Sequence, residues 1–243
     1  MDEISMGNEI KVKHANELNL VPMRNFNATE MNLFFALCAK MKDKGTQKIR
    51  FEFENLRDLS DYKPTATKRF SDDLESLYDK MLKLTLRTHK EGVREKFVLF
   101  TGFKIDENEK YVEISVNSDL EHILNELSSE FVKYELVEFT SIRSSYAKTM
   151  YRLLKQYRST GLFKIRIEDF REILDVPKSY RMTDIDSRVL KPIQDELSDF
   201  FDPLKIKKIK ARKGNKIALL EFRFKEKQEF EPVPMVDWTK DYK

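Results

Sequence analysis

An internal repeat constrains the fold of this chain more than any other feature of its sequence. The segments 48–59 (KIRFEFENLRDL) and 163–174 (FKIRIEDFREIL) share an Ile-Arg-apolar-Glu core, and a short amphipathic stretch follows it in both. A match this brief would be weak alone, but similar segments flank both copies in the same order. The repeat therefore predicts that one structural unit occurs twice.

The flanks predict helices in matching positions. Before the first copy, apolar residues at helical spacing predict a helix with Thr29 as its N-cap and Gly45 as its end. Its counterpart before the second copy covers 141–161. After the copies, apolar stripes predict longer helices over 66–81 and 183–197.

Each copy then ends in segments of alternating apolar and polar residues, which predict strands. These segments are 83–89, 96–105 and 111–116 in the first copy, and 203–212 and 216–224 in the second. Gly214 and Asn215 suit a tight hairpin turn. Helix, short strand, short helix, long helix and hairpin is the order of a winged helix-turn-helix. The sequence thus predicts an α+β fold with two such domains in tandem.

We place an N-terminal domain at 1–136, a C-terminal domain at 137–225 and an extended tail at 226–243. The boundary falls between an expected helix over 118–127 and a helix that begins near Ile142. This segment contains no Gly- or Pro-rich linker, so we expect packed domains with restricted freedom.

Charge divides unevenly between the two halves. Residues 142–225 contain 21 Lys and Arg against 11 Asp and Glu, whereas residues 1–141 contain 21 against 26. A polyanion would therefore be attracted to the second half.

The long helix of the second copy has a basic flank. Arg181, Arg188 and Lys191 lie opposite its apolar stripe, and Lys178 and Tyr180 lie at its amino end. In a helix-turn-helix this helix enters the DNA major groove, where Arg and Lys reach guanine O6 and N7. A solvated basic face is the alternative interpretation. The positive charge of the surrounding segment favours DNA binding.

Two further groups complete the predicted DNA interface. Cations of the second hairpin suit phosphates or the minor groove: Lys205, Lys207, Lys208, Lys210, Arg212, Lys213 and Lys216. Groups at the start of the first long helix suit phosphate contacts: Lys63, Thr65, Thr67, Lys68 and Arg69. Because the first half is acidic, a solvated helix start is the alternative for the second group.

Pro192 lies inside the expected helix over 183–197. A proline there removes a backbone hydrogen bond and costs about 3 kcal/mol, so we expect a kink near Lys191. Thr183 is expected to cap this helix, and Asp184 and Asp186 favour its positive amino end.

The sequence argues against an enzyme, a cofactor and a bound metal ion. His14, His89 and His122 lack the His-x-His spacing of a rolling-circle nickase. Asp184 and Asp186 point away from each other on a helix, which disfavours a Mg²⁺-binding pair. Six glycines form no phosphate-cradling loop, so ATP use is not expected.

The only cysteine, Cys38, lies in the apolar run LFFALCA and is expected to be a reduced core residue. That run is too short to span a bilayer, and the acidic start MDEISMGN differs from a signal peptide. We therefore expect a cytoplasmic protein without a membrane segment.

Three segments of the second half closely resemble the initiator Rep proteins of theta-replicating, iteron-containing plasmids. They are 140–161, 167–177 and 180–197. The resemblance extends over nearly the whole chain. It implies binding to repeated DNA sites at a plasmid origin, origin opening with the host initiator and helicase, and repression of the protein's own promoter. It also implies that dimers repress while monomers initiate.

The resemblance assigns different tasks to the two domains. The second winged helix would read bases, and Arg188 falls on the arginine of the family's Arg-Val-Leu segment. The first domain would contact the DNA backbone and form the dimer interface. We expect the dimer surface on strands 96–105 and 111–116, which include Val98 and Val112. A winged-helix transcriptional regulator without a replication role is the alternative that the residues alone leave open.

Overall fold

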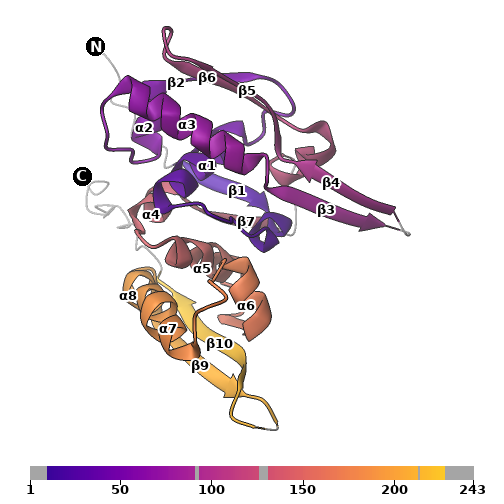
Figure 1. Cartoon of the computed structure of the whole chain (residues 1–243), viewed down its shortest axis with the longest axis vertical. Coiled ribbons are helices and arrows are strands. Elements are labelled where there is room, and N and C mark those ends of the chain that lie inside the picture. The colour runs from indigo at the N-terminus through magenta and orange to yellow at the C-terminus, as the bar shows by residue number, and fades with distance from the viewer. Residues whose placement is uncertain (1–9, 91–92, 126–130, 213, 228–243) are drawn as a thin grey trace, which may run out of the picture.

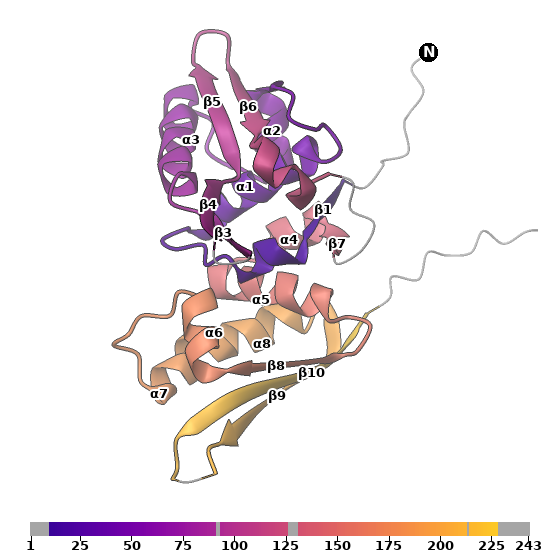
Figure 2. The same cartoon turned by 90° about the vertical axis from the view of Figure 1, so that its right-hand side faces the viewer.

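The computed structural model describes residues 10–90, 93–125, 131–212 and 214–227. Two winged-helix units lie one above the other along the long axis of the molecule (Figure 1). Helix α5 (Ser145–Gln156) lies at their junction, between the first unit and the sheet of the second (Figure 2).

The two units contain the same elements in the same order. The first consists of α1 (Ala28–Met41), β2 (Ile49–Glu52), α2 (Phe53–Leu59), α3 (Thr67–Met81), β5 (Phe100–Asp106) and β6 (Tyr111–Val116). The second consists of α5, β8 (Leu162–Arg166), α6 (Ile167–Ile173), α7 (Met182–Ile185), the π-helical turn η3 (Asp186–Leu190), α8 (Lys191–Leu197), β9 (Phe201–Lys210) and β10 (Ile217–Glu226). The antiparallel sheets have the orders β2-β6-β5 and β8-β10-β9. The prediction of two tandem winged helices is confirmed.

The turn after the first helix of each helix-turn-helix has the same geometry in both copies. Asp61 and Asp175 have positive φ angles of 52° and 53°. The next residue donates its N–H to a carbonyl five residues earlier, from Tyr62 to Arg57 at 2.9 Å and from Val176 to Arg171 at 2.8 Å. This 6→1 bond is typical of a Schellman motif, which ends a helix sharply. The internal repeat therefore extends to the backbone.

Other elements surround this repeated plan. They are β1 (Lys11–Ala15), η1 (Asn16–Leu20), β3 (Thr85–Lys90), β4 (Val93–Val98), η2 (Ser118–Ile123), β7 (Phe131–Glu135) and α4 (Leu136–Ser141). Strands β1 and β7 pair near the junction of the units, and β3 and β4 form a separate hairpin that projects from the first unit (Figure 1). The sequence did not predict β1 or β7.

The strand expected over 96–105 is divided in the structure. At Leu99 the chain leaves β4 and enters β5, and the Leu99 carbonyl accepts a hydrogen bond from the Asn117 N–H at 2.8 Å. The expected dimer surface stays a prediction, but the assumption that strand 111–116 offers a free sheet edge was wrong. Strand β6 is the central strand of its sheet, paired on both sides, and Val112 is fully buried.

Three expected helix ends also differ. Helix α1 is capped by Asn27 rather than Thr29, because Asn27 and Glu30 form a reciprocal capping box with bonds of 2.8 and 2.9 Å. The same helix ends at Met41, before Gly45. The helix expected over 118–127 is the short 3-10 helix η2, and residues 126–130 lie outside the described residues.

The hairpin loop of the second unit is longer than the tight turn we expected. The Ala211 N–H bonds to the Lys216 carbonyl at 2.9 Å, which leaves a loop rather than two turn residues. Gly214 has a φ of 87°, whereas Asn215 is not among the residues of positive φ. Lys213 and most of the expected tail, residues 228–243, lie outside the described residues.

Helix α5 is buried along almost its whole length and belongs to the core of both units. Its Arg152 is 1% exposed, and its guanidinium lies 4.7 Å from the centre of the Phe35 ring of α1. Asn19 of η1 donates to the Arg152 carbonyl at 3.3 Å and to Gln156 at 2.9 Å. Polar and apolar contacts thus join α5 to the first unit.

We predict that two loop glycines differ sharply in their tolerance of alanine. Both have positive φ, but a Cβ on Gly161 would lie 2.5 Å from the Phe224 carbonyl oxygen, whereas one on Gly214 would meet no atom within 4 Å. Gly161→Ala should lower the free energy of unfolding by about 2–4 kcal/mol, and Gly214→Ala by about 1 kcal/mol. Urea denaturation measures both, and equal losses would contradict the close approach at Gly161.

Candidate DNA interface

The second helix of the helix-turn-helix in the second unit runs without a break from α7 through η3 to α8, and we call it the reading helix after its predicted role. Its geometry changes just before Pro192. Pro192 has no N–H, and its ring crowds the carbonyl of Arg188 four residues before. In the structure η3 is a wider π-helical turn, in which the Lys191 N–H reaches back to the Asp186 carbonyl. The backbone of Lys191 stays helical (φ −63°, ψ −51°), and the irregularity expected near Lys191 takes the form of a π turn.

The amino end of this helix is closed by Asp184. Its carboxylate accepts the Arg181 N–H at 2.9 Å, whereas Thr183, the expected cap, is exposed within α7. Asp184 therefore satisfies a free N–H of the first turn and places a negative charge at the positive helix end.

Arg188 and Tyr180, both predicted to contact DNA, are brought together by the fold. The Arg188 guanidinium lies 5.3 Å from the centre of the Tyr180 ring and 4.0 Å from Asp184. A hydrogen bond with Tyr180 raises the pKa of Arg188. The Arg188 side chain remains 62% exposed. An exposed guanidinium beside an aromatic ring can still turn free N–H groups toward a base, which suits bidentate contact with guanine.

The position of Tyr180 is itself fixed by its backbone. Arg171 of α6 donates to the Tyr180 carbonyl at 2.7 Å, and the Tyr180 N–H bonds to Pro177 at 3.0 Å. The sequence predicted Tyr180 as a direct contact to a base or phosphate. That contact stays a prediction, and the structure adds that the half-buried Tyr180 ring lies beside Arg188.

The remaining cations of this helix lie at the surface. Lys178 is exposed in the loop before α7, and Arg181 and Lys191 are exposed on the helix. Together with Arg188 they border the surface that the reading helix presents to solvent.

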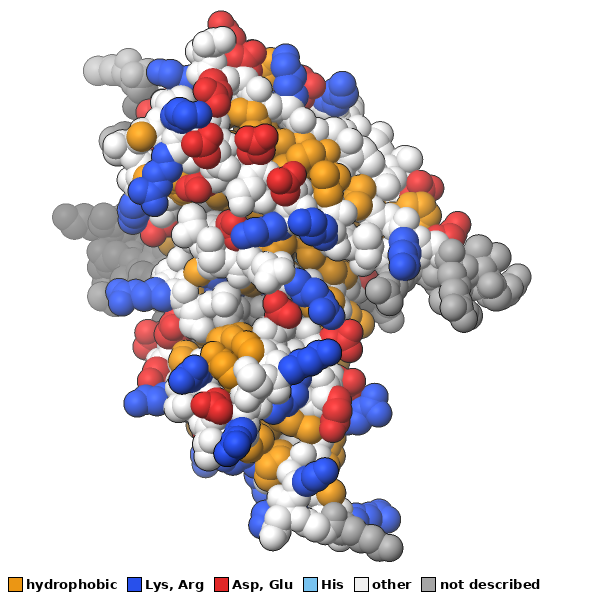
Figure 3. Space-filling model, viewed as in Figure 1, with side chains coloured by type: hydrophobic (Ala, Val, Ile, Leu, Met, Phe, Trp, Pro, Cys, Tyr) orange, Lys and Arg blue, Asp and Glu red, His pale blue; other side chains and the backbone are white. Residues whose placement is uncertain are grey.

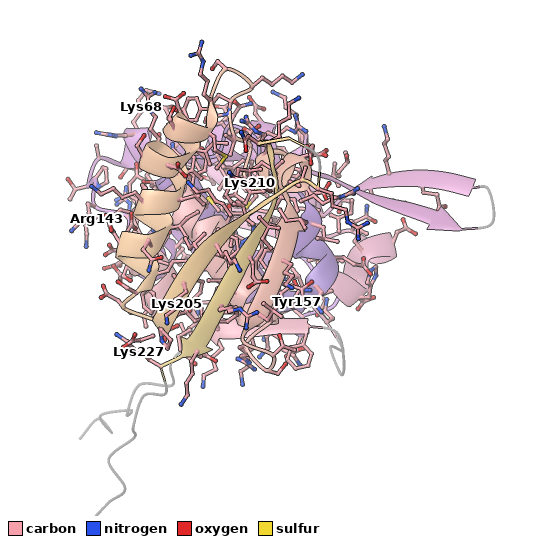
Figure 4. All side chains as sticks on the ribbon, turned by 90° about the horizontal axis from the view of Figure 1, so that it is seen from below. Lys68, Arg143, Tyr157, Lys205, Lys210 and Lys227 are labelled. Carbon is pink, nitrogen blue, oxygen red and sulfur yellow. The ribbon has the colours of Figure 1, made fainter. Side chains whose placement is uncertain are left out.

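The pleat of β9 divides the predicted wing cations between two faces of the sheet. Leu204 and Ile206 turn toward the core, so Lys208 and Lys210 continue that face toward the hairpin loop. Lys208 accordingly reaches the reading helix and pairs with Asp186 at 2.7 Å. Lys210 lies far along β9 from Lys205, which is near Lys227 at the base of the hairpin (Figure 4). Arg212 and Lys216 are exposed in the loop.

Lys205 and Lys207 lie on the outer face, on the side of the sheet away from the helices. There Lys207 is opposite Glu221, whose carboxylate contacts Arg223 at 2.7 Å and Lys164 at 3.0 Å. Hydrogen bonds from Arg223 and then Lys164 lower the pKa of Glu221 to about 2. The structure does not bring Lys205 and Lys207 together with the reading helix.

The corresponding cations of the first unit are partly neutralised. Lys63 pairs with Asp61, and Lys68 pairs with Asp72 at 3.4 Å. Thr65 and Arg69 are exposed and Thr67 is half-buried, so these groups do gather at the start of α3. The N-cap residue, Ala66, supplies no side-chain cap to this helix end.

The first wing has the opposite charge to the second. The end of β5 and the loop after it contain Asp106, Glu107 and Glu109 against one cation, Lys110, and the Glu107 carboxylate accepts a bond from Ser71 of α3 at 2.8 Å. In Figure 3 both kinds of charge occur on each unit, but acidic side chains lie at the top of the molecule, where this loop lies, and basic side chains lie around the lower tip, where the β9–β10 hairpin ends. The electrostatic field therefore favours a polyanion at the second unit.

Within the described part of the chain, no group of three or more His, Cys, Asp and Glu residues could hold a metal ion. Cys38 is a free, buried thiol in α1, and burial raises its pKa. No helix in the described ranges is long and apolar enough to cross a membrane.

Comparisons with known proteins agree with this geometry. Residues 11–155 match the profile of "Initiator Replication protein, WH1", and residues 166–224 match "Initiator Rep protein, WH2". The chain belongs to the initiator Rep protein family. This family consists of DNA-binding replication initiators and is not a recognised enzyme family. The predicted domain boundary at residues 136 and 137 stays a prediction.

Individual Rep relatives have similar sequences or folds. A "Probable replication protein rep" of Bifidobacterium longum is 36% identical over 194 residues, which cover 79% of this chain and 65% of that protein. The chain thus matches less than two thirds of this relative. The crystal structure of Pi initiator protein in complex with iteron DNA has a TM-score of 0.71 and 15% identity, and the match covers 92% of this chain and 100% of that one. At this identity the likeness concerns the fold.

We predict that Arg188→Ala removes a base contact. It should cost about 1–3 kcal/mol of binding free energy on a specific site and weaken the preference at one base pair. Arg166→Ala is the matched control, because Arg166 is exposed on the outer face of the sheet and pairs with Asp169. Titrations on specific and random duplexes measure the difference, and equal weakening on both by Arg188→Ala would show a phosphate contact instead.

Proposed function

We propose that this chain is a plasmid replication initiator that binds iteron repeats at an origin. The observation that carries the proposal is the match of both units to the winged-helix profiles of initiator Rep proteins. The exposed Arg188 beside Tyr180 on the reading helix supports it. The relative with 36% identity is named a probable replication protein, and Pi initiator protein was crystallised with iteron DNA.

In this proposal the two winged helices have different tasks. Arg188 reads bases, with Tyr180 holding its guanidinium, and Lys178, Arg181 and Lys191 contact the DNA around it. Lys208, Lys210, Arg212 and Lys216 bring positive charge to phosphates beside the reading helix. The start of α3 contacts the DNA backbone through Thr65 and Arg69. The acidic side chains of the first wing would repel phosphates, so in this proposal the first unit contacts the DNA backbone at the start of α3 and not through its wing.

We also propose that the protein opens the origin with the host initiator and helicase, and that a dimer represses its own promoter. The β3–β4 hairpin supports a dimer surface, because its two strands pair only with each other within the described residues. A free strand edge is a template for pairing with a second copy. Strand β5 is also at the edge of its sheet and extends this surface.

The wing supplies a prediction for DNA affinity. Replacing Lys210, Arg212 and Lys216 together by alanine should weaken binding to all sequences and flatten the dependence of log K on log salt, by up to about 0.9 for each phosphate that the protein no longer neutralises. Lys205→Ala with Lys207→Ala is the control and should leave the slope unchanged, since these residues lie on the outer face. If the slope of log K against log salt is unchanged in the triple variant, these three wing residues do not contact phosphates.

A replication assay tests the proposed function directly. A plasmid that carries this gene and its flanking repeats, and no other origin, should transform a host only when the gene is intact. Arg188→Ala should reduce the yield of transformants because the repeats are bound more weakly. If specific binding to the repeats persists but no plasmid is maintained, the protein is a transcriptional regulator rather than an initiator.

A further inference from the structure

The loop between η1 and α1, residues 21–27, contacts the helix-turn-helix of the second unit. The Asn25 N–H donates to the Asp175 carboxylate at 3.2 Å, and Arg24 lies 3.8 Å from Glu172 of α6. Asp175 is the positive-φ residue that ends the turn after α6, shortly before the reading helix. The first unit therefore contacts the second directly beside its DNA-reading element.

The same loop is attached to α3, the corresponding helix of the first unit. Lys80, in the last turn of α3, donates to the Asn25 carbonyl at 2.9 Å and to the two Glu30 oxygens at 2.5 and 2.7 Å. The Glu30 side chain is only 8% exposed and also accepts the Asn27 N–H of the α1 capping box. Asn25 is thus held by α3 on one side and by the turn after α6 on the other.

The internal repeat shows that this contact is specific to the second copy. Asp61 occupies the same place in the first turn, with almost the same φ angle as Asp175. Its carboxylate pairs with Lys63 of its own turn. A contact to the other unit is therefore not a consequence of the turn itself.

Two separated contacts limit the motion between the units more than one contact does. Helix α5 and the segment just after it join them, through the bonds of Asn19 to Arg152 and Gln156 and a bond from Arg158 to the Lys133 carbonyl at 3.1 Å. The loop adds a second point of contact, on α6 and its turn. Rotation about α5 would then break the bonds of Asn25 and Arg24.

We propose that the contact of Asn25 with Asp175, supported by Arg24 and Glu172, sets the distance between the two DNA segments that the winged helices bind. Asp175 is then a positioning residue for α3 and the reading helix of the second unit. The inference rests on the proposed function, since it needs both units on one repeat. It implies that the protein discriminates against repeats whose two contacted segments are moved apart or together.

The test compares two equivalent aspartates. Asp175→Gly removes the carboxylate and keeps a residue that accepts positive φ, and it is combined with Arg24→Ala. Asp61→Gly is the matched control, with the same backbone change in the other turn. The probes are the repeat duplex and duplexes with one base pair inserted or deleted between the two contacted segments.

We expect the wild type and the Asp61→Gly variant to discriminate equally against the altered spacings. In the Asp175→Gly, Arg24→Ala variant, the ratio of the affinity for the normal repeat to the affinity for the altered repeats should fall about three- to tenfold. A change of this size is expected for two exposed polar contacts. Unchanged discrimination, or an equal loss in Asp61→Gly, would overturn the proposal.

A variant that does not fold and a wild type that does not bind would have other meanings. If Asp175→Gly fails to fold, as judged by thermal unfolding, Asp175→Asn with Arg24→Ala replaces it. Asparagine also tolerates positive φ, and the loss of charge should still reduce discrimination. If the wild type binds no repeat duplex, the proposed function fails rather than the spacing inference.

Discussion

Burial of α5 between the two units is the constraint on which the rest of the structure depends. A charged side chain costs free energy when it is buried, unless other groups replace its water. Arg152 has the Phe35 ring, the Leu18 carbonyl and the Asn19 side chain near it, and no ion pair within the described residues. Lys155 of the same helix is paired with Glu138 and Glu226 at 2.8 and 2.6 Å. These contacts place each winged helix relative to the other.

The two units share one backbone plan but differ in the charge of their surfaces. Both have the same sheet order and the same Schellman turn, but one wing is acidic and the other basic. In the first unit, carboxylates neutralise Lys63 and Lys68 locally. In the second, Asp184 and Asp186 also lie near cations, yet Arg188 remains exposed over Tyr180. This difference in charge is the physical basis of the proposed division of tasks between the two units.

Much of this organisation could be predicted from the sequence, because helical periodicity and the internal repeat are local signals. The residues that determine the site geometry were harder to predict. The pairing of β1 with β7 joins segments more than a hundred residues apart, and no local pattern indicates it. Alternation along β9 could have shown that Lys207 and Lys208 lie on opposite faces, but the lysine-rich composition masked it. Asp186 as the partner of Lys208 follows only from the packing of the helix against the hairpin.

The most direct measurement is a hydroxyl-radical footprint of the protein, as a monomer, on a single repeat. If α5 presents both winged helices to one duplex, two protected segments should appear, separated by about one helical turn of roughly 10 base pairs. The segment under the second unit should be the one that changes with Arg188→Ala. Protection of one segment alone would contradict joint binding by the two units, because the first winged helix would then make no contact with the repeat.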